Sequence, residues 1–555
     1  MFWFRCIFLV SYRFKMELLL DEIKLFTTDE KIISLVIEKL RECGCCKRCI
    51  LRFICIKDAQ TYRVVDDQRI ETLLGLDSDV SARARTASSE ELISNGSQNG
   101  LLANAGAEPD DGVTQSKELG VCTACLGVLQ EQYCKQSFLE EIRDMVTKED
   151  FQFSVFFCSL SLPVSLLLRE HSLWIILNDL QPSVFTEDYR NNIIPVKDVW
   201  KWVNGSSLAN ILNVPFDQKS SFAISLTFVH TNTEKECSFL YDLKPDIFRK
   251  RKNNRHGWDV FNQTNVLKAI QNATIKKFRQ FYNCPPKKLL YPCDCDPIKC
   301  HQEALFIAGR YNKYSRHLSQ TPWFVDGAKK FETSVEELIC TPMMQLVKAS
   351  DKKFSASGRE DVDVRMLGTG RPFVVELINP RRVSFTVQQL LTLQMAINDS
   401  SPDVQVRDIQ VVAKEETSIL KEGEEEKIKR YRALCWTKDD VDVERIDALA
   451  KQGSVTIHQK TPIRVLHRRT LAVRDRVIHS LSAKKIDDHH FNLFLSTQAG
   501  TYVKEFVHGD FGRTVPNLGT VLGTDCDILE LDVEAVELDW PKALQPDDSK
   551  EAVDP

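Results

Sequence analysis

The sequence lacks several features that would place it in a specialised class of protein. No apolar run reaches the roughly 18 residues that a membrane-spanning helix needs, so we expect no membrane partner. Only 22 glycines and 20 prolines occur among 555 residues, which excludes a collagen-like chain. The 73 lysines and arginines nearly balance 78 aspartates and glutamates, so any surface for a polyanion must be a local patch. A P-loop and a dinucleotide-binding fingerprint are also missing.

The remaining composition, 43% hydrophobic and 27% charged, is typical of a globular protein. We predict one domain over residues 16–285 and a second over residues 286–545, with the turn-rich CPPKK at the boundary. Residues 77–119 have few large apolar side chains, so we expect a disordered insertion there. Residues 1–15 are a doubtful leader: either translation starts at residue 16 or the basic stretch is a weak mitochondrial presequence. The acidic tail, residues 546–555, is expected to fray.

Apolar patterning predicts mixed secondary structure in both domains. In the first domain, the stripe within Ile32–Leu40 indicates a helix, while FQFSVFFCSLSL and SFAISLTFVH indicate strands. The second domain has many short strand-like runs, among them ALFIAGRY, FVVELIN, YRALCW and FNLFLSTQAG. Its helices are fewer, around residues 334–349 and 386–397. This order of elements predicts an α+β domain on a large mixed sheet.

Eighteen cysteines without a secretory signal indicate reduced thiols, and paired cysteines then indicate metal rather than disulfides. Cys46 and Cys49 form one CxxC pair, and Cys122 and Cys125 form another, 72 residues further on. Two such pairs complete the tetrahedral sulfur site that Zn²⁺ favours, so we predict a structural zinc. Cys43 with Cys46 is the alternative first pair. A thiol redox sensor or ordinary reduced cysteines are the alternative interpretations.

The stretch GREDVDVR presents acids in a basic setting. Glu360, Asp361 and Asp363 follow Gly358, with Arg359 before them and Arg365 after them. The glycine allows a sharp turn and close approach of a large ligand, and the arginines suit phosphates. The residues alone do not decide which of the three acids would be catalytic. An ordinary surface turn is the alternative interpretation of the same pattern.

Three other stretches carry groups of basic residues, two of them together with aromatic residues. GRYNKYSR, residues 309–316, interleaves tyrosines with cations, and QKTPIRVLHRR, residues 459–469, is strongly basic. The mix of tyrosines and cations in the first stretch suits phosphates and stacked bases, and a solvated edge strand is the alternative interpretation of each stretch. GTYVKEFVHGD, residues 500–510, follows a predicted strand.

Together these four motifs resemble the archaeal and eukaryotic tRNA pseudouridine synthase family that modifies positions 54 and 55 of the TΨC arm. The likeness is strongest from about residue 289 to 541. The CxxC pairs resemble that family's zinc-bearing N-terminal accessory domain, which has a THUMP-like RNA-binding fold. The resemblance therefore implies tRNA as the partner, structural Zn²⁺, no catalytic cofactor and a pseudouridine synthase catalytic domain.

The resemblance also implies individual roles. Asp361 matches the aspartate that pseudouridine synthases share, Tyr431 matches a tyrosine that stacks on the target base, and Lys504 matches the cation that pairs with the aspartate. The residues implied in substrate binding are Tyr431, Tyr502, Arg310, Lys313, Arg316, Arg464, Arg468 and Arg469. The carboxylate would act as nucleophile or as base toward the sugar.

A second interpretation is an RNA-binding scaffold that assists primary microRNA processing without catalysis. The complete set of Asp361, Tyr431 and Lys504 favours the enzyme. We expect a monomer in the nucleus and cytoplasm, with the mitochondrion as an alternative; the basic run KPDIFRKRKNNR, residues 244–255, could serve nuclear import or face RNA.

Overall fold

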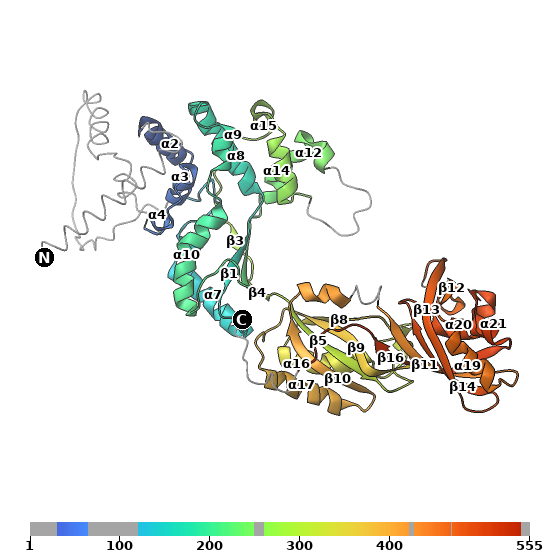
Figure 1. Ribbon diagram of the computed structural model, residues 1–555. Helices are drawn as coiled ribbons and strands as arrows, with labels where there is room; N and C mark the ends of the chain where they lie inside the picture. The colour runs from blue at the N-terminus through green and yellow to red at the C-terminus, as the bar shows by residue number, and fades with distance from the viewer. Residues whose placement is uncertain (1–29, 65–119, 249–259, 421–426, 468, 545–555) are drawn as a thin grey trace, which may run out of the picture. The chain divides into compact units, whose positions relative to one another are not determined.

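The computed structural model describes residues 30–64, 120–248, 260–420, 427–467 and 469–544 (Figure 1). The predicted leader, the predicted disordered insertion and the acidic tail lie outside these residues. The chain divides into an N-terminal unit and a C-terminal unit. The N-terminal unit consists of residues up to 150 with residues 154–301, and the C-terminal unit consists of residues 151–153 with residues from 302 onward.

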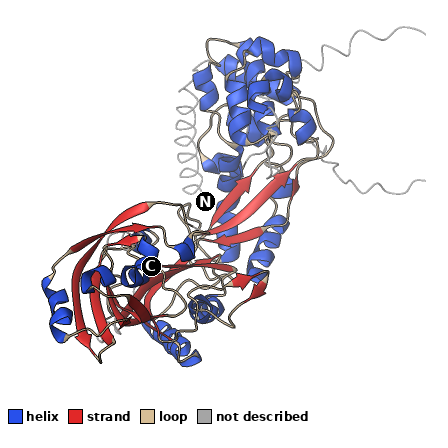
Figure 2. Ribbon diagram, turned by 90° about the vertical axis from the view of Figure 1, so that its right-hand side faces the viewer, coloured by secondary structure: helices blue, strands red, loops and turns tan. Residues whose placement is uncertain are grey.

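Most of the described N-terminal unit is helical (Figure 2). In α7 the buried side chains are Phe138, Leu139, Ile142 and Val146, whose spacing places them on one face of the helix. By contrast, α8 is buried almost all round, consistent with a central position among the helices. The helices of the unit are α2 Glu30–Glu42, α3 Lys47–Phe53, α4 Ala59–Arg63, η1 Glu131–Tyr133, α7 Gln136–Glu149, α8 Ser165–Leu180, α9 Glu187–Asn191, α10 Val196–Leu212, α11 Thr233–Cys237, α12 Leu240–Leu243, α13 Pro245–Phe248, α14 Gln263–Gln271 and α15 Ile275–Phe281.

A small sheet accompanies these helices. Its strands are β1 Phe157–Ser161, β2 Phe222–Val229, β3 Asp294–Cys295 and β4 Lys299–Gln302. β1 runs parallel to β2, and β2 also pairs with β3 and β4. Residues 286–301, which the sequence analysis assigned to the second domain, thus contribute β3 and most of β4 to the sheet built on β2.

The C-terminal unit is built on a ten-stranded mixed sheet, which confirms the predicted α+β class (Figure 2). Along the sheet the strands follow the order β10-β5-β9-β16-β11-β14-β13-β12-β15, and β8 pairs with β9. Most pairs are antiparallel, whereas β16 and β9 are parallel. The sheet strands are β5 Leu305–Lys313, β8 Asp351–Ala356, β9 Val364–Ile378, β10 Val404–Val412, β11 Lys429–Thr437, β12 Val455–Lys460, β13 Val473–Lys485, β14 His490–Thr497, β15 Thr514–Val515 and β16 Cys526–Val536. A separate hairpin joins β6 Phe324–Val325 to β7 Ala328–Lys329.

The two helices that the sequence predicts in this unit are present, and each begins at a capping residue. The Ser334 side chain accepts a hydrogen bond from the main-chain N–H of Glu337 at the start of α16, Val335–Val347. Thr386 and Gln389 form a capping box at the start of α17, Val387–Ser400. The smaller helices of the unit are η2 Glu415–Thr417, α19 Val443–Lys451, η3 Ile463–Val465, α20 Val503–His508, η4 Gly509–Gly512 and α21 Leu518–Leu522.

The core of the C-terminal unit lies between the sheet and these helices. Fully buried side chains from both contribute to it, among them Ile339, Met343, Phe373, Val375 and Leu493. Among the described residues, no helix is both long and apolar enough to cross a bilayer.

Candidate active site and metal centre

The acidic motif found in the sequence forms the connection between β8 and β9. This loop, residues 357–363, is named here the acidic loop. Gly358 has φ +94°, and a Cβ there would lie 2.8 Å from Arg371 Nη1. A side chain at position 358 would therefore be strained and would collide with the group that supports the loop.

Glu360 points into the protein beneath the acidic loop. Its carboxylate accepts hydrogen bonds from the Tyr311 hydroxyl at 2.8 Å and from Arg371 Nε at 2.8 Å. The Glu360 and Arg371 side chains are essentially fully buried, and Arg371 Nη1 also donates to the Ser357 carbonyl at 2.7 Å. Glu360, one of the three candidate acids, is thus engaged in a buried ion pair that holds the loop.

Lys313 lies under the same loop and is fully buried. Its Nζ donates to the main-chain carbonyls of Leu318, Asp361 and Val362 at 2.8, 3.1 and 2.8 Å. Burial lowers the pKa of Lys313 to about 8. Lys313 was expected to contact RNA, but its ammonium group faces main-chain oxygens inside the protein.

Arg310 and Arg316, expected to contact RNA as well, are also engaged within the protein. Arg310 is buried and donates to several carbonyls, including those of Leu538 and Trp540. Burial lowers its pKa to about 10. Arg316 pairs with Glu530 and Asp532, both at 2.7 Å. These two arginines join β5 and the segment after it to β16 and the residues that follow it.

Asp361 has a different environment, because its carboxylate faces outward. Arg464 Nη1 lies 2.8 Å from Asp361 Oδ2, and Arg464 Nε lies 2.6 Å from the buried Glu505. The Asp361 and Arg464 side chains are 36% and 38% exposed, so this ion pair is open to solvent. Arg464 belongs to η3 and Glu505 to α20, so two elements distant in sequence orient the cation beside Asp361.

Lys504 lies near the same carboxylate but binds another one more closely. Its Nζ is 3.8 Å from Asp361 Oδ2 and 2.8 and 2.6 Å from the two carboxylate oxygens of Asp363. Partial burial acts to raise the pKa of Asp363, but the hydrogen bond and charge of Lys504 lower it below its ordinary value. The nearest cation to Asp361 is therefore Arg464 rather than the expected Lys504.

The two tyrosines of the implied site are half-buried. Tyr431 lies on β11. Burial raises the pKa of its hydroxyl, and the charges of Arg371 and Glu360 act on that pKa in opposite directions, Arg371 lowering it and Glu360 raising it. Tyr502 precedes α20, and its main chain exchanges hydrogen bonds with the Gln459 side chain at 2.9 and 3.0 Å. Arg469 is exposed, and Arg468 lies outside the described residues.

Sequence reasoning missed Glu505 as a member of this site. Glu505 is 1% exposed and lies on the six-residue helix α20, in which Val503 and Phe506 are also buried. The available signal was an acid followed directly by two apolar residues, Phe506 and Val507, on a short helix, because a buried carboxylate requires a cation nearby.

The four predicted zinc ligands come together in the N-terminal unit. The sulfur atoms of Cys46, Cys49, Cys122 and Cys125 lie within 4.8 Å of one another, and all four residues are buried. Four converging thiols are the donor set that Zn²⁺ favours, so these residues fit the ion. Cys43 is not a member of the cluster, which favours the Cys46–Cys49 pair.

The two cysteine turns lead into different local structures. Cys46 is the N-cap of α3, and its main-chain N–H donates to Cys122 Sγ at 3.1 Å. The second pair instead continues into turns. Leu126 and Gly127 have φ of +47° and +89°, which a right-handed helix cannot accommodate.

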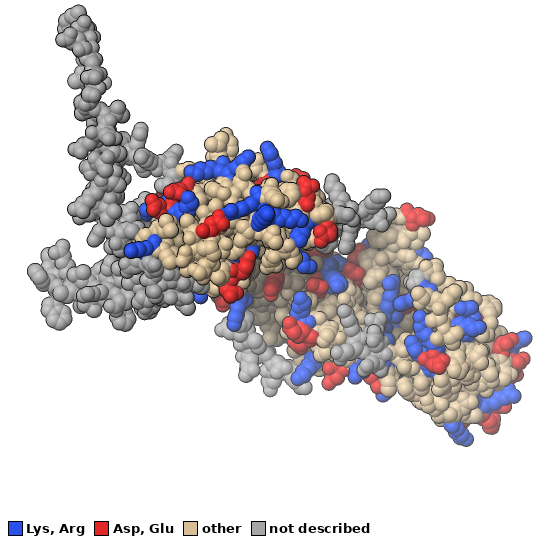
Figure 3. All heavy atoms as spheres, turned by 90° about the horizontal axis from the view of Figure 1, so that it is seen from above, with Lys and Arg blue, Asp and Glu red and all other residues tan. Residues whose placement is uncertain are grey.

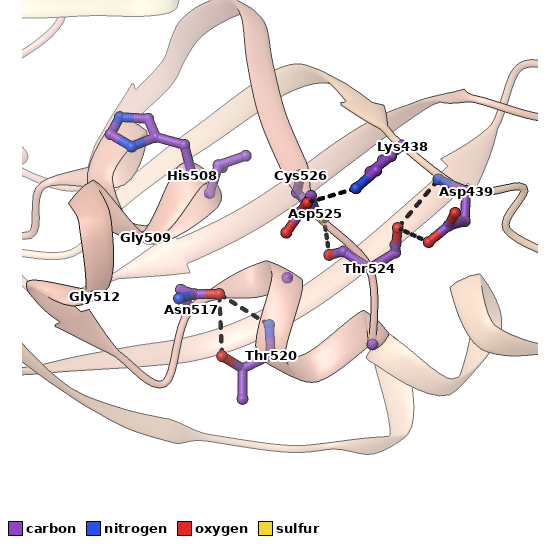
Figure 4. Close-up of a pocket in the computed structure, with 13 residues that line it drawn as sticks. Lys438, Asp439, His508, Gly509, Gly512, Asn517, Thr520, Thr524, Asp525 and Cys526 are labelled. Carbon is purple, nitrogen blue, oxygen red and sulfur yellow. Dashed lines mark hydrogen bonds and ion pairs between the residues drawn. The ribbon is translucent and has the colours of Figure 1, made fainter.

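A polar pocket of about 650 Å³ lies elsewhere in the C-terminal unit (Figure 4). Lys438 pairs with Asp525 at its rim, and the Asn517 side chain caps the helix that carries Thr520. It is lined by Lys438, Asp439, Val507, His508, Gly509, Gly512, Asn517, Gly519, Thr520, Gly523, Thr524, Asp525 and Cys526. None of the implied catalytic side chains lines this pocket.

Charges on the visible surface agree with the near balance in the sequence. Lysine and arginine side chains are interspersed with aspartates and glutamates over the face shown in Figure 3. Contacts with a polyanion must therefore use local groups of cations.

Comparison with known proteins places the chain among the tRNA pseudouridine synthases, which are isomerases. It is 42% identical over 521 residues to human "tRNA pseudouridine synthase Pus10", an alignment that covers 92% of this chain and 98% of the human protein. A protein of the same name from Thermofilum pendens is 41% identical over 275 residues, covering 49% of this chain and 61% of that protein. Family models described as "Pus10, C-terminal" and "Eukaryotic Pus10, N-terminal" match residues 306–537 and 122–300. The chain belongs to the Pus10 family, which confirms the resemblance in its motifs.

Among solved structures, the "Crystal Structure of a Cbf5-Nop10-Gar1 Complex" is similar at 17% identity with a TM-score of 0.23. That match covers 40% of this chain and 47% of the other. The THUMP-like fold of the accessory domain stays a prediction.

Proposed function

We propose that the chain isomerises uridine to pseudouridine at position 54, position 55 or both in the TΨC arm of tRNA, with Asp361 as the catalytic residue. The observation that carries this proposal is the different engagement of three neighbouring acids. Glu360 is buried against Arg371, and Asp363 is held by Lys504. Asp361 and Asp363 both reach solvent, but Lys504 binds both carboxylate oxygens of Asp363. The Asp361 carboxylate is paired with the more exposed Arg464 through one oxygen, Oδ2, as suits a group that must reach a substrate.

The reaction moves the uracil ring from one carbon–nitrogen bond to a carbon–carbon bond. The N1–C1′ bond breaks, the ring turns, C5 bonds to C1′, and the proton on C5 is lost while N1 gains one. The Asp361 carboxylate can add to the sugar as a nucleophile or remove a proton as a base. Neither route needs a redox partner or a group donor.

Support for Asp361 comes from both sides of the acidic loop. Arg464 and, further away, Lys504 place positive charge beside the carboxylate, which favours its ionised form. Lys313 and the Glu360–Arg371 pair hold the main chain of the loop from inside. The carboxylate is thereby oriented before the substrate arrives, which lowers the entropic cost of reaching the reactive geometry.

Substrate contacts are assigned to the residues that remain accessible. We assign stacking on the target uracil to Tyr431 and a wall of the pocket to Tyr502, because both rings are half-buried near the acidic loop or its cation. Arg469 is exposed and suits a phosphate contact. A target base must leave its stack to reach such a site, and an aromatic ring offsets part of that cost.

The cysteine cluster is assigned a structural role. When bound, Zn²⁺ would be held by Cys46, Cys49, Cys122 and Cys125 and would tie the α2–α3 region to the turns around residue 125. Four protein ligands leave no open position for substrate. No observation favours the scaffold interpretation over the enzyme.

Three unmodified tRNA transcripts test the positions: one natural, one with cytidine in place of uridine 54, and one with cytidine in place of uridine 55. Pseudouridine should form in the natural transcript at one or both positions and should disappear only where the uridine has been replaced. Pseudouridine formed outside the TΨC arm, or none in any transcript, would contradict the proposal.

A further inference from the structure

Four consecutive residues after α20 adopt a left-handed backbone. The φ angles of Gly509, Asp510, Phe511 and Gly512 are +74°, +46°, +54° and +76°. Glycine adopts this conformation freely, but in other residues the Cβ crowds the following carbonyl oxygen. Two adjacent non-glycine residues therefore carry backbone strain, which persists only where the surroundings impose it and which concentrates at functional sites.

The surroundings that impose the turn are those that hold Arg464. The buried Asp510 carboxylate accepts a hydrogen bond from the main-chain N–H of Ile463 at 3.3 Å and lies 3.4 Å from Arg513 Nε. Arg513 Nη2 donates to the Thr461 carbonyl at 2.6 Å. The turn is thus bound on two sides to residues 461–464, the segment that places Arg464 against Asp361.

The turn exposes the aromatic ring of Phe511 to solvent. Phe511 is 95% exposed, more than any other large apolar side chain among the described residues. The fold does not use the ring, since a glycine at position 511 would relieve the strain and would leave no cavity. Figure 4 shows Gly509 and Gly512, the two ends of the turn, beside the polar pocket.

The residues around the turn favour one kind of partner. Lys460 and Arg469 are exposed on the adjoining segment, and Arg464 is partly exposed. The Lys460 main-chain N–H donates to the Arg513 carbonyl at 2.9 Å, which brings this segment alongside the turn. An exposed ring on a turn that adjoins a segment with exposed cations suits single-stranded nucleic acid, because bases can stack on the ring while the cations contact phosphates.

We propose that Phe511 is a stacking platform for a nucleobase of the RNA substrate other than the target uridine. This proposal rests on the proposed function for the identity of the RNA. The contacts of Asp510 and Arg513 hold the main chain of the turn against residues 461–464, so a base stacked on Phe511 would position the RNA relative to Arg464 and Asp361.

The full-length protein and a fluorescently labelled, unmodified tRNA transcript test the proposal by equilibrium binding. Phe511→Gly should raise the Kd about 10-fold, within the range for loss of one base–aromatic stack, while thermal stability stays equal or rises because glycine relieves the strain. Phe511→Trp should bind within two-fold of the wild type, and its added indole emission should fall when tRNA binds. Phe511→Leu should lose affinity as Phe511→Gly does.

Salt dependence separates stacking from charge. Phe511→Gly should leave the slope of log Kd against log salt unchanged, whereas Arg469→Ala should reduce it by about one. Leu529→Ala, at a 54% exposed apolar position on β16, is the matched control and should bind normally.

Two results would overturn the stacking proposal: a Kd for Phe511→Gly within two-fold of the wild type, or wild-type affinity in Phe511→Leu. The second would indicate an apolar contact rather than a stacked base. A failure of the proposed function would be recognised by a different measurement. The wild-type protein would then form no pseudouridine in tRNA, whatever the Kd values of the variants.

Discussion

Replacing Lys313 with methionine tests whether this lysine supports the acidic loop or contacts RNA. Methionine keeps most of the length and apolar volume of the side chain but removes the ammonium group. Three main-chain carbonyls, those of Leu318, Asp361 and Val362, then lose their donor. Two of the three belong to the acidic loop.

The size of the effect follows from burial. An unpaired buried polar group costs roughly 1–3 kcal/mol, and removing one member of a buried charged network costs roughly 3–5 kcal/mol. Methionine also removes the free-energy cost of burying a charge, which offsets part of this loss of stability. That cost is reflected in the pKa of Lys313, which burial lowers to about 8. We therefore expect a loss of about 3 kcal/mol, at the lower end of that range. For a unit of this size the melting temperature should fall by roughly 6–12 °C.

Differential scanning calorimetry and tRNA binding together provide the assay. Lys313→Met should lower the melting transition of the C-terminal unit and the turnover rate, while the salt slope of tRNA binding stays unchanged. Lys460→Met, which removes an exposed lysine, is the control and should leave the melting temperature unchanged. An unchanged melting temperature with a salt slope reduced by about one would refute the supporting role and return Lys313 to the RNA-contacting residues.

The remaining predictions concern the metal centre, a buried histidine and the cation beside Asp361. The purified protein should hold about one zinc per chain, Cys125→Ser should release it, and Cys43→Ser should retain it by metal analysis; zinc loss in Cys43→Ser would contradict the assigned ligands. His171 is buried with both ring nitrogens unpaired, and burial lowers its pKa to about 3. Because the unfolded chain binds a proton below about pH 6.5 that the folded chain does not, the free energy of unfolding should fall by about 1.4 kcal/mol per unit from pH 6 to pH 4. In denaturant titrations His171→Phe should remove this part of the slope, and an equal slope in both proteins would contradict it. In single-turnover reactions at saturating tRNA, Arg464→Gln should be slower than Lys504→Gln, since Arg464 is the cation 2.8 Å from Asp361; the reverse order would restore Lys504 as the principal partner.

Elements that depend on local signals were predictable from the sequence. Ser334 and Thr386 mark the starts of α16 and α17 because each side chain caps the helix that follows it. The class of the C-terminal sheet followed from many short apolar runs. The paired cysteines likewise indicated a metal centre, although only the structure distinguishes Cys46 with Cys49 from the overlapping pair that contains Cys43.

Residues whose surroundings come from distant parts of the chain were not predictable. Arg310 and Lys313 lie on β5, which is paired on both edges by β9 and β10 and buried from Ile307 to Lys313. Side chains on both faces of β5 are therefore buried, and the alternation of residues along the strand does not distinguish an inner face from an outer one. The sequence gives no sign that the cations on this strand are buried rather than exposed. The pairing of Asp361 with Arg464 joins residues about a hundred positions apart, which spacing within a motif does not reveal.

The most direct test of the proposed mechanism compares three variants that each remove one charge from the acidic loop: Asp361→Asn, Asp363→Asn and Glu360→Gln. Pseudouridine in an unmodified tRNA transcript is measured after incubation with each purified protein, and tRNA affinity is measured in parallel. Asp361→Asn should bind tRNA within a few-fold of the wild type and form no detectable pseudouridine, because an amide replaces neither a nucleophile nor a base. The other two variants should retain activity, with Glu360→Gln less stable because Arg371 loses its buried partner. Pseudouridine formation by Asp361→Asn at the wild-type rate would contradict the assignment of the active site.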